Sequence, residues 1–92
     1  MPKLTAAQIK SALIAVPDWK KTTVTIARTF AFKDFPRAIR FVSRVAELAE
    51  KAGHHPDIDI RWNKVAFRLT THSEGGLTVK DFALARQFDR LA

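Results

Sequence analysis

Two of the three histidines in this chain, His54 and His55, are adjacent and are followed by Pro56. Proline restricts the residue before it to extended conformations, so the two imidazoles must point in different directions. One of them can face a cleft while the other braces it. The same residues also fit a solvated polar linker that happens to contain histidine, so both interpretations stay open at this point.

The third histidine, His72, comes from another part of the sequence. It shares its strand parity with Arg68, opposite the apolar residues that alternate from Val65, so we expect it to lie outside the main core. If two strands pair across a turn at residues 63 and 64, His72 lies beside His55. Two distant stretches would then gather three imidazoles at one end of a sheet.

Two carboxylates could assist these imidazoles. Glu50 lies one helical turn before His54, where it could hold an imidazole N–H and fix the tautomer, although its spacing also fits an exposed helical residue. Asp81 follows Thr78 at the spacing of a capping box, and that structural role alone would account for it. Because a carboxylate near a helix N-terminus is stabilised in its ionised form, we expect no acid role for Asp81.

The other residue types leave imidazole chemistry as the main possibility. The chain has no cysteine, which excludes thiol nucleophiles and thiolate metal sites, and its serines lack the setting of a nucleophile elbow. Histidines and carboxylates are ligands of zinc and iron, but adjacent histidines diverge and the usual zinc-binding spacings are missing, so we predict no metal and no cofactor. Near neutral pH, imidazoles can act as general acids and bases, which suits the elimination or addition of water.

Three helices are predicted around these residues. Thr5 and Gln8 have the spacing of a capping box, and apolar residues follow at helical intervals until about Ala15. Asp34, with a proline in the turn after it, resembles an N-cap, and Gly53 suits the left-handed residue that ends a helix. A second capping-box spacing, just before the last apolar stripe, predicts the third helix.

Alternating apolar residues predict four strands. Residues 22–32 alternate β-branched and aromatic side chains, and residues 19–21 could form a short strand before them. Beyond the second helix, Ile58, Ile60 and Trp62 share one face, so we expect Trp62 in the core or in a subunit contact. Only one strand-to-strand connection contains a helix, which favours an α+β fold with antiparallel strands and the helices on one face.

Size and composition describe one small domain. The 92 residues are 47% hydrophobic and 27% charged, so residues 1–92 have room for a single core and would gain from a partner subunit. The sequence shows neither a signal-peptide pattern nor an apolar run long enough to span a membrane. The lack of cysteine suits a reducing compartment, so we expect a cytoplasmic protein.

The formal net charge of +7 raises the expectation of an anionic partner. Basic residues are scattered from Lys3 to Arg90 instead of forming an arm. Arg37, Arg40 and Arg44 fall on one side of the second helix and could contact phosphates or a regulatory protein, although such a face is usually only solvated. A basic binding module therefore remains the alternative to an enzyme, with nucleic acid as the less favoured partner.

Four stretches of the sequence form a specific combination. They are Phe-Ala-Phe-Lys-Asp-Phe at residues 30–35, Glu-Lys-Ala-Gly-His-His-Pro at 50–56, Trp-Asn-Lys-Val at 62–65, and Thr-His at 71–72 with Gly-Leu-Thr at 76–78 and Asp81. Together they resemble the pterin-4a-carbinolamine dehydratase family, over roughly residues 19–92. The resemblance implies a four-stranded antiparallel sheet with three helices on one face, assembled as a homodimer or homotetramer.

The resemblance also implies an activity. Members of this family remove water from 4a-hydroxytetrahydropterin, which aromatic amino acid hydroxylases produce, to give the quinonoid dihydropterin that a reductase recycles. Some animal members also bind a transcription factor, and a paralogue acting on molybdopterin-type pterins would present the same imidazoles. Both possibilities stay open beside the dehydratase.

Carried over residue by residue, the resemblance implies a pterin pocket lined by three histidines with neighbouring residues in support: His54, His55 and His72, with Glu50, Pro56 and Asp81. We hypothesise that His55 and His72 carry the proton transfers. His54, held by Glu50, would bind and orient the pterin. One departure from the family pattern is Trp62, which stands where tyrosine is common.

Overall fold

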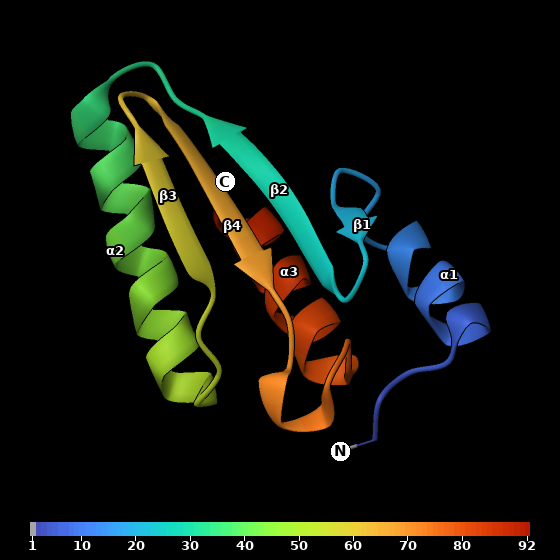
Figure 1. The fold of residues 1–92 in the computed structure, drawn as a ribbon. Helices are drawn as coiled ribbons and strands as arrows, with labels where there is room; N and C mark the ends of the chain where they lie inside the picture. The colour runs from blue at the N-terminus through green and yellow to red at the C-terminus, as the bar shows by residue number, and fades with distance from the viewer. Residues whose placement is uncertain (1) are drawn as a thin grey trace.

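The computed structural model describes residues 2–92 and has the predicted order of helices and strands. The elements are α1 (Ala6–Ile14), β1 (Lys20–Thr22), β2 (Thr25–Ala31), α2 (Phe35–Ala52), β3 (Asp57–Arg61), β4 (Lys64–Leu69), the 3₁₀ turn η1 (His72–Glu74) and α3 (Val79–Leu91), as Figure 1 shows. The strands form one four-stranded antiparallel sheet, which confirms the predicted α+β class. Among residues 2–92, no helix is both long and apolar enough to cross a membrane.

The strands lie in the order β1-β2-β4-β3, so β2 and β4 form the centre of the sheet. The helix α2 spans the connection from β2 to β3, and β4 then returns between these two strands. β3 pairs only with β4 and is an edge strand. Because β3 and β4 are antiparallel, the start of β3 lies next to the end of β4, and the loops that carry the histidines adjoin these two points.

Three helix limits follow from the residue types that mark them in the sequence, namely the start of α1 and both ends of α2. Thr5 accepts a hydrogen bond from the N–H of Gln8, whose side chain accepts one from the N–H of Thr5. Asp34 accepts a hydrogen bond from the N–H of Arg37 at 3.0 Å, and α2 ends at Gly53, which has a φ of +63°. These contacts satisfy backbone groups that helix ends leave unpaired, and they confirm the predicted limits.

The core lies between the sheet and the helices α2 and α3, with α1 adding apolar residues near β1 (Figure 1). Alternate residues of β2 and β4 point toward these helices. The apolar side chains buried between the sheet, α2 and α3 include Ile26, Phe30, Val65, Phe67, Leu69, Ala38, Phe41, Val45, Leu84, Ala85 and Phe88. The ring of Phe67 lies 5.6 Å from that of Phe30 and 5.4 Å from that of Phe88. This aromatic packing fixes β4 against α3 and so positions the segment that follows β4.

The strand predicted over residues 22–32 is interrupted by a turn. Thr23 has a φ of +52° and Val24 is exposed, so the chain reverses there and β2 begins at Thr25. The short strand predicted before this turn is confirmed as β1, which starts one residue later than expected.

The hairpin between β3 and β4 turns one residue earlier than predicted. Arg61 pairs with Lys64, so the two turn residues are Trp62 and Asn63. The side-chain amide of Asn63 donates to the carbonyl oxygen of Phe32 at 2.8 Å, which holds Asn63 inside the turn. Trp62 has a φ of +52° and is 71% exposed, so of its two predicted places the core is wrong, and a subunit contact stays a prediction.

Candidate active site

Both histidine-bearing stretches adjoin the same end of the sheet. His54 and His55 precede β3, and His72 begins η1 shortly after β4 ends (Figure 1). Asp57 at the start of β3 pairs with Arg68 near the end of β4. The prediction that His72 faces His55 across paired strands is wrong, because the register differs and His72 lies beyond the strand.

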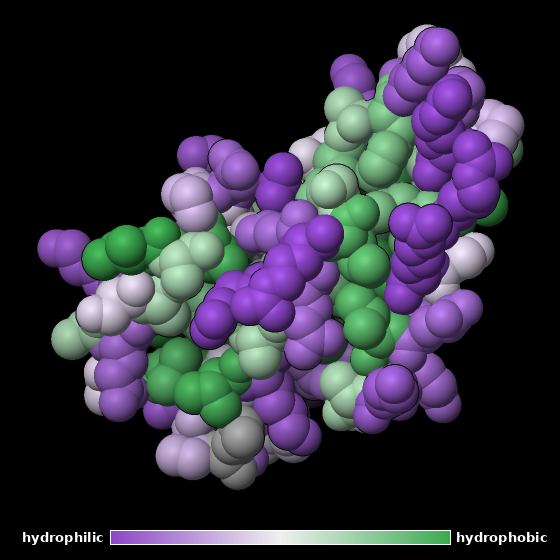
Figure 2. Space-filling model, turned by 180° about the vertical axis from the view of Figure 1, so that it is seen from behind, coloured by the Kyte–Doolittle hydropathy of each residue, from purple (hydrophilic) through white to green (hydrophobic). Residues whose placement is uncertain are grey.

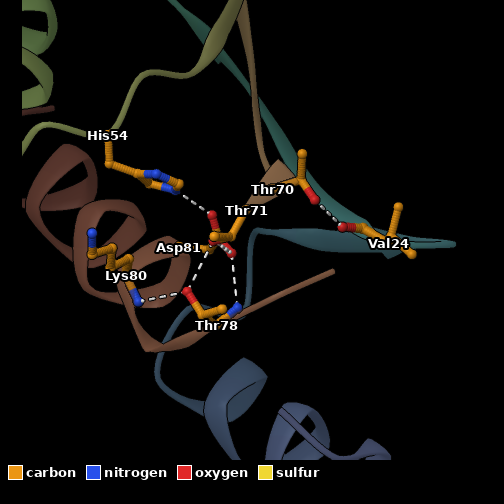
Figure 3. Close-up of polar contacts among 7 residues, drawn as sticks. All are labelled: Val24, His54, Thr70, Thr71, Thr78, Lys80 and Asp81. Carbon is orange, nitrogen blue, oxygen red and sulfur yellow. Dashed lines mark hydrogen bonds and ion pairs between the residues drawn. The ribbon is translucent and has the colours of Figure 1, made fainter. Parts of the chain in front are cut away.

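His54 contacts Asp81 and not Glu50. The Nε2 atom of His54 lies 2.6 Å from Oδ1 of Asp81, and the two side chains are 12% and 0% exposed (Figure 3). The prediction that Glu50 holds His54 is therefore wrong. The left-handed conformation of Gly53 ends the helix before His54, so the spacing of one helical turn no longer places Glu50 and His54 over each other.

Glu50 instead contacts the second histidine. Its Oε1 atom lies 2.9 Å from Nε2 of His55, and both side chains are exposed. An exposed pair of this kind adds little to stability, although it favours one orientation of the ring. Pro56 follows, half-buried, at the entrance to β3. Because proline holds His55 in an extended conformation, the two neighbouring imidazoles diverge, as predicted.

Asp81 lies in a buried hydrogen-bond network at the start of α3. Its Oδ2 atom accepts from the N–H of Thr78 and from the hydroxyl of Thr71, both at 2.9 Å. The two threonine hydroxyls lie 2.9 Å apart, and Thr78 completes the predicted capping box (Figure 3). Asp81 therefore does more than cap α3, because its Oδ1 atom contacts His54 in the loop after α2.

Thr71 is the residue of this network that sequence reasoning missed. It is 7% exposed and forms an isolated bridge with Gly76 that closes the η1 loop. A signal for it was present, because Thr71 continues the alternation of the buried residues of β4 and so places a polar side chain at a core-facing position. A buried hydroxyl requires a hydrogen-bond partner, and Asp81 supplies it.

His72 lies outside this network but directly beside it in the chain. It follows Thr71, its side chain is exposed, and its carbonyl oxygen accepts from the N–H of Gly75 at 3.1 Å. Thr71 therefore anchors the loop that carries His72 and also contacts the carboxylate that holds His54.

The site combines one imidazole backed by a buried carboxylate with two exposed imidazoles. A carboxylate behind an imidazole fixes which ring nitrogen carries the proton and leaves the other nitrogen for a ligand. Within residues 2–92, no group of three His, Asp or Glu side chains is arranged to hold a metal ion. What the arrangement can do chemically is exchange hydrogen bonds and protons with a polar ligand.

A second candidate surface lies on the helical side of the molecule. A cavity of about 240 Å³ is lined by basic and apolar residues: Phe32, Arg37, Arg40, Phe41, Arg44, Leu91 and Ala92. The guanidinium of Arg37 is paired with the carboxylate of Asp34 at 2.6 Å. Arg40 and Arg44 are the other two cationic residues that line this cavity. Figure 2 shows this side of the molecule, where hydrophilic side chains over α2 run beside an apolar strip.

The chain matches known proteins over nearly its whole length. The family model described as pterin 4 alpha carbinolamine dehydratase matches residues 2–91. A protein of Chloroflexus aurantiacus, provisionally named a pterin-4-alpha-carbinolamine dehydratase, is 56% identical over 91 residues, which cover 99% of this chain and 98% of that protein. A protein of Nocardia farcinica with the same provisional name is 57% identical over 89 residues, which cover 97% and 94%.

Solved structures match the fold as well. The crystal structure of a transcriptional coactivator/pterin dehydratase from Brucella melitensis superposes with a TM-score of 0.94 at 39% identity and covers 98% of both chains. A pterin dehydratase-like protein identified as a RuBisCO assembly factor in the alpha-carboxysome superposes with a TM-score of 0.68 at 25% identity, covering 80% of this chain and 86% of that one. The shared fold thus occurs in proteins described by an enzymatic role and in proteins described by an assembly role.

Proposed function

Because this chain belongs to the pterin 4 alpha carbinolamine dehydratase family, we propose that it removes water from a 4a-hydroxytetrahydropterin to give the quinonoid dihydropterin. The observation that carries the proposal is the 2.6 Å contact between His54 and the buried Asp81, with two further imidazoles adjoining the same end of the sheet. The reaction neither oxidises nor reduces the pterin, so residues that move protons are sufficient for it.

The reaction requires two proton transfers at neighbouring atoms of the pterin. The C4a–O bond breaks, and the 4a-hydroxyl leaves as water after it has received a proton. The N5–H bond also breaks, and its electron pair forms the double bond between C4a and N5. An acid must therefore reach the leaving oxygen and a base must reach the N5 proton, each within hydrogen-bond distance.

We assign the two transfers to His55 and His72, whose side chains are both exposed and so open to a substrate. His54 is held from behind by Asp81, so it binds and orients the pterin through its other ring nitrogen. Glu50 orients His55 through their 2.9 Å contact. This assignment keeps the roles expected from the sequence but replaces Glu50 with Asp81 as the partner of His54.

The substrate also defines the cellular setting of the proposal. Aromatic amino acid hydroxylases produce 4a-hydroxytetrahydropterins, and dehydration returns the pterin to a form that a reductase can recycle. We therefore place the protein in the cytoplasm, with such a hydroxylase as its functional partner. A chain without cysteine fits that reducing compartment.

We also infer that the protein acts as a homo-oligomer. The edge strand β3 carries Ile58 and Ile60, which are both exposed large apolar residues, and Trp62 follows at its turn. Open sheet edges with apolar side chains favour pairing with another strand. A second copy of the chain offers the same edge, which suits the two-fold contacts that most homo-oligomers use.

The test of the proposed reaction is to generate the 4a-carbinolamine and to follow its decay by rapid mixing, with and without the protein. The proposal predicts that the decay rate rises in proportion to protein concentration and saturates with substrate. A decay rate that stays at the spontaneous value would reject the dehydratase. Faster turnover of a molybdopterin-type pterin would instead favour the alternative of a paralogue with another substrate.

A second candidate function is the binding of an anionic partner, and a separate surface of the molecule supports it. Arg40 and Arg44 line the cavity beside Phe32 and Phe41. Contacts between such a surface and phosphates weaken steeply as salt rises. Binding of DNA or RNA that is salt-sensitive and is lost when Arg40 and Arg44 are both changed to Glu would support this function, whereas no binding at moderate salt would reject a nucleic-acid partner.

A further inference from the structure

We propose that Thr71 and Thr78 are positioning residues whose hydroxyls hold Asp81 so that His54 carries its proton on Nε2 and presents Nδ1 as a hydrogen-bond acceptor. A buried chain of side-chain contacts runs through these residues and ends at the imidazole of His54. The role of His54 toward the pterin rests on the proposed function, whereas the tautomer of His54 does not.

The direction of each hydrogen bond follows from counting protons. An ionised carboxylate can only accept, so the single hydroxyl proton of Thr71 is donated to Oδ2 of Asp81 at 2.9 Å. The contact of 2.9 Å between the two hydroxyls must then use the proton of Thr78. The Oγ1 atom of Thr78 in turn accepts from the N–H of Lys80 at 3.3 Å. On this count, every donor in this chain points toward the carboxylate, along the contacts that Figure 3 draws as dashed lines.

The two oxygens of Asp81 consequently have different partners. Oδ2 accepts both the hydroxyl of Thr71 and the N–H of Thr78, whereas Oδ1 contacts Nε2 of His54 at 2.6 Å. Thr78 and Asp81 are completely buried and Thr71 is 7% exposed, so water has little access to replace any of these bonds. The carboxylate is therefore fixed in one orientation, and Nε2 of His54 must be the donor.

The hydroxyl of Thr71 is not required by the local structure. The capping box at the start of α3 is complete with Thr78 and Asp81 alone. At its core-facing position, a valine would have nearly the same shape as Thr71 without the cost of burying a hydroxyl. The hydroxyl is thus accounted for by its bond to Asp81, which links the end of β4 to the start of α3 and, through His54, to the loop after α2.

For the proposed reaction, the tautomer of His54 determines which hydrogen bond this residue can make to the pterin. A neutral imidazole that donates from Nε2 has its lone pair on Nδ1, so His54 accepts a hydrogen bond from an N–H of the pterin and does not donate one. If the hydroxyl of Thr71 is removed, Oδ2 loses one of its two donors and the carboxylate can rotate. The tautomer of His54 is then no longer fixed.

The test compares Thr71→Val, which has nearly the same shape, with Thr71→Ser, which keeps the hydroxyl. Long-range ¹H–¹⁵N correlation spectra of the imidazoles report which ring nitrogen carries the proton. We expect the Nε2–H form for His54 in the wild type and in Thr71→Ser, and a mixture of tautomers in Thr71→Val. The signals of His55 and His72 should not change in either variant.

Turnover provides the second readout. We expect Thr71→Val to lower kcat by about 10-fold or more with a smaller change in KM, because a wrong tautomer of His54 leaves the bound pterin poorly oriented for the proton transfers. Thr71→Ser should restore kcat to within about 2-fold of the wild type. A Thr71→Val protein with a wild-type His54 tautomer and a wild-type kcat would overturn the proposal.

The wild-type spectrum tests the tautomer of His54 even if Thr71→Val does not fold. An Nδ1–H tautomer or a doubly protonated ring at His54 near neutral pH would overturn the direction of the whole chain. The same spectrum separates the role of the threonines from the proposed dehydratase activity. An Nε2–H tautomer in a protein that does not accelerate decay of the carbinolamine would reject the dehydratase and leave the role of the threonines in positioning His54 intact.

Discussion

At the scale of single residues, the buried carboxylate divides the three histidines into two kinds. His54 has a fixed partner in Asp81, whereas His55 and His72 are exposed. The histidines could be found from the sequence, because a double histidine before proline and a threonine-histidine pair are local patterns. The partner of His54 could not, since it lies 27 residues away and depends on how the loop after α2 meets α3.

Replacement of His72 tests its role in proton transfer. We expect His72→Ala to lower kcat for carbinolamine dehydration by about 10²–10⁴-fold, which is the usual cost of removing a general acid or base. The neighbouring Ser73 is also exposed and lies in the same η1 turn, so Ser73→Ala is the matched control and should keep near-normal turnover. Near-normal kcat in His72→Ala would end this assignment.

The two carboxylates should differ sharply in their effect on stability. Asp81→Ala leaves three buried or nearly buried donors without an acceptor, so we expect it to lower the free energy of unfolding by about 2–4 kcal/mol. Glu50→Ala removes only an exposed contact and should change that free energy by less than about 0.5 kcal/mol. Urea unfolding curves of the two variants measure the difference. Equal losses would show that Asp81 is not the structural centre of the site.

Among the elements, the helix ends could be predicted, whereas the positions of the two strand turns could not. Caps such as Thr5, Asp34 and Gly53 act on backbone groups within a few residues, so their spacing in the sequence is sufficient. The β3–β4 turn is held by a contact between Asn63 and Phe32, which are 31 residues apart. Because no local pattern contains that contact, the sequence predicts the turn one residue too late and does not show that Trp62 lies outside the core.

The end of α2 offers a test at this scale. Gly53 has a φ of +63°, and a Cβ atom built there would meet no heavy atom within 4 Å, so the cost of Gly53→Ala is backbone strain alone. We expect a loss of about 1 kcal/mol in the free energy of unfolding. Gly53→Asn is the control, because asparagine adopts this conformation more readily and should lose less. If alanine and asparagine are tolerated equally, the left-handed C-cap does not limit this turn.

At the scale of the whole molecule, the two edges of the sheet differ. β1 has three residues, among them Lys20 and Lys21, and short lysine-bearing edges resist pairing. β3 has five residues and carries exposed Ile58 and Ile60. The sequence predicted the strands and the advantage of a partner subunit, but the exposed edge could be identified only once the strand order was known.

Charge along β3 selects one register for a two-fold contact. If two copies pair antiparallel with Ile60 opposite Ile60, then Asp59 of each copy faces Arg61 of the other, and Ile58 approaches Trp62. If Asp59 lies on the two-fold axis instead, like charges face each other directly, which is unfavourable in a sheet. The oligomer proposed above is therefore expected to use the register centred on Ile60.

Charge reversal tests this register. Asp59→Arg and Arg61→Asp should each shift the protein toward monomers in sedimentation velocity experiments, because like charges then face each other. The double variant restores opposite charges and should recover the wild-type assembly. Lys20→Asp, on the other edge of the sheet, is the control and should have no effect. A wild-type protein that stays monomeric at all concentrations would reject the contact.

Whether these imidazoles catalyse dehydration is decided by the rate constant for decay of the 4a-carbinolamine, compared between the wild-type protein and the His55→Ala, His72→Ala double variant. We expect strong acceleration by the wild type and a rate close to the spontaneous decay with the folded double variant. Equal acceleration by both proteins would contradict this expectation, because protons would then reach the pterin without these imidazoles. So would a wild-type protein that leaves the spontaneous rate unchanged.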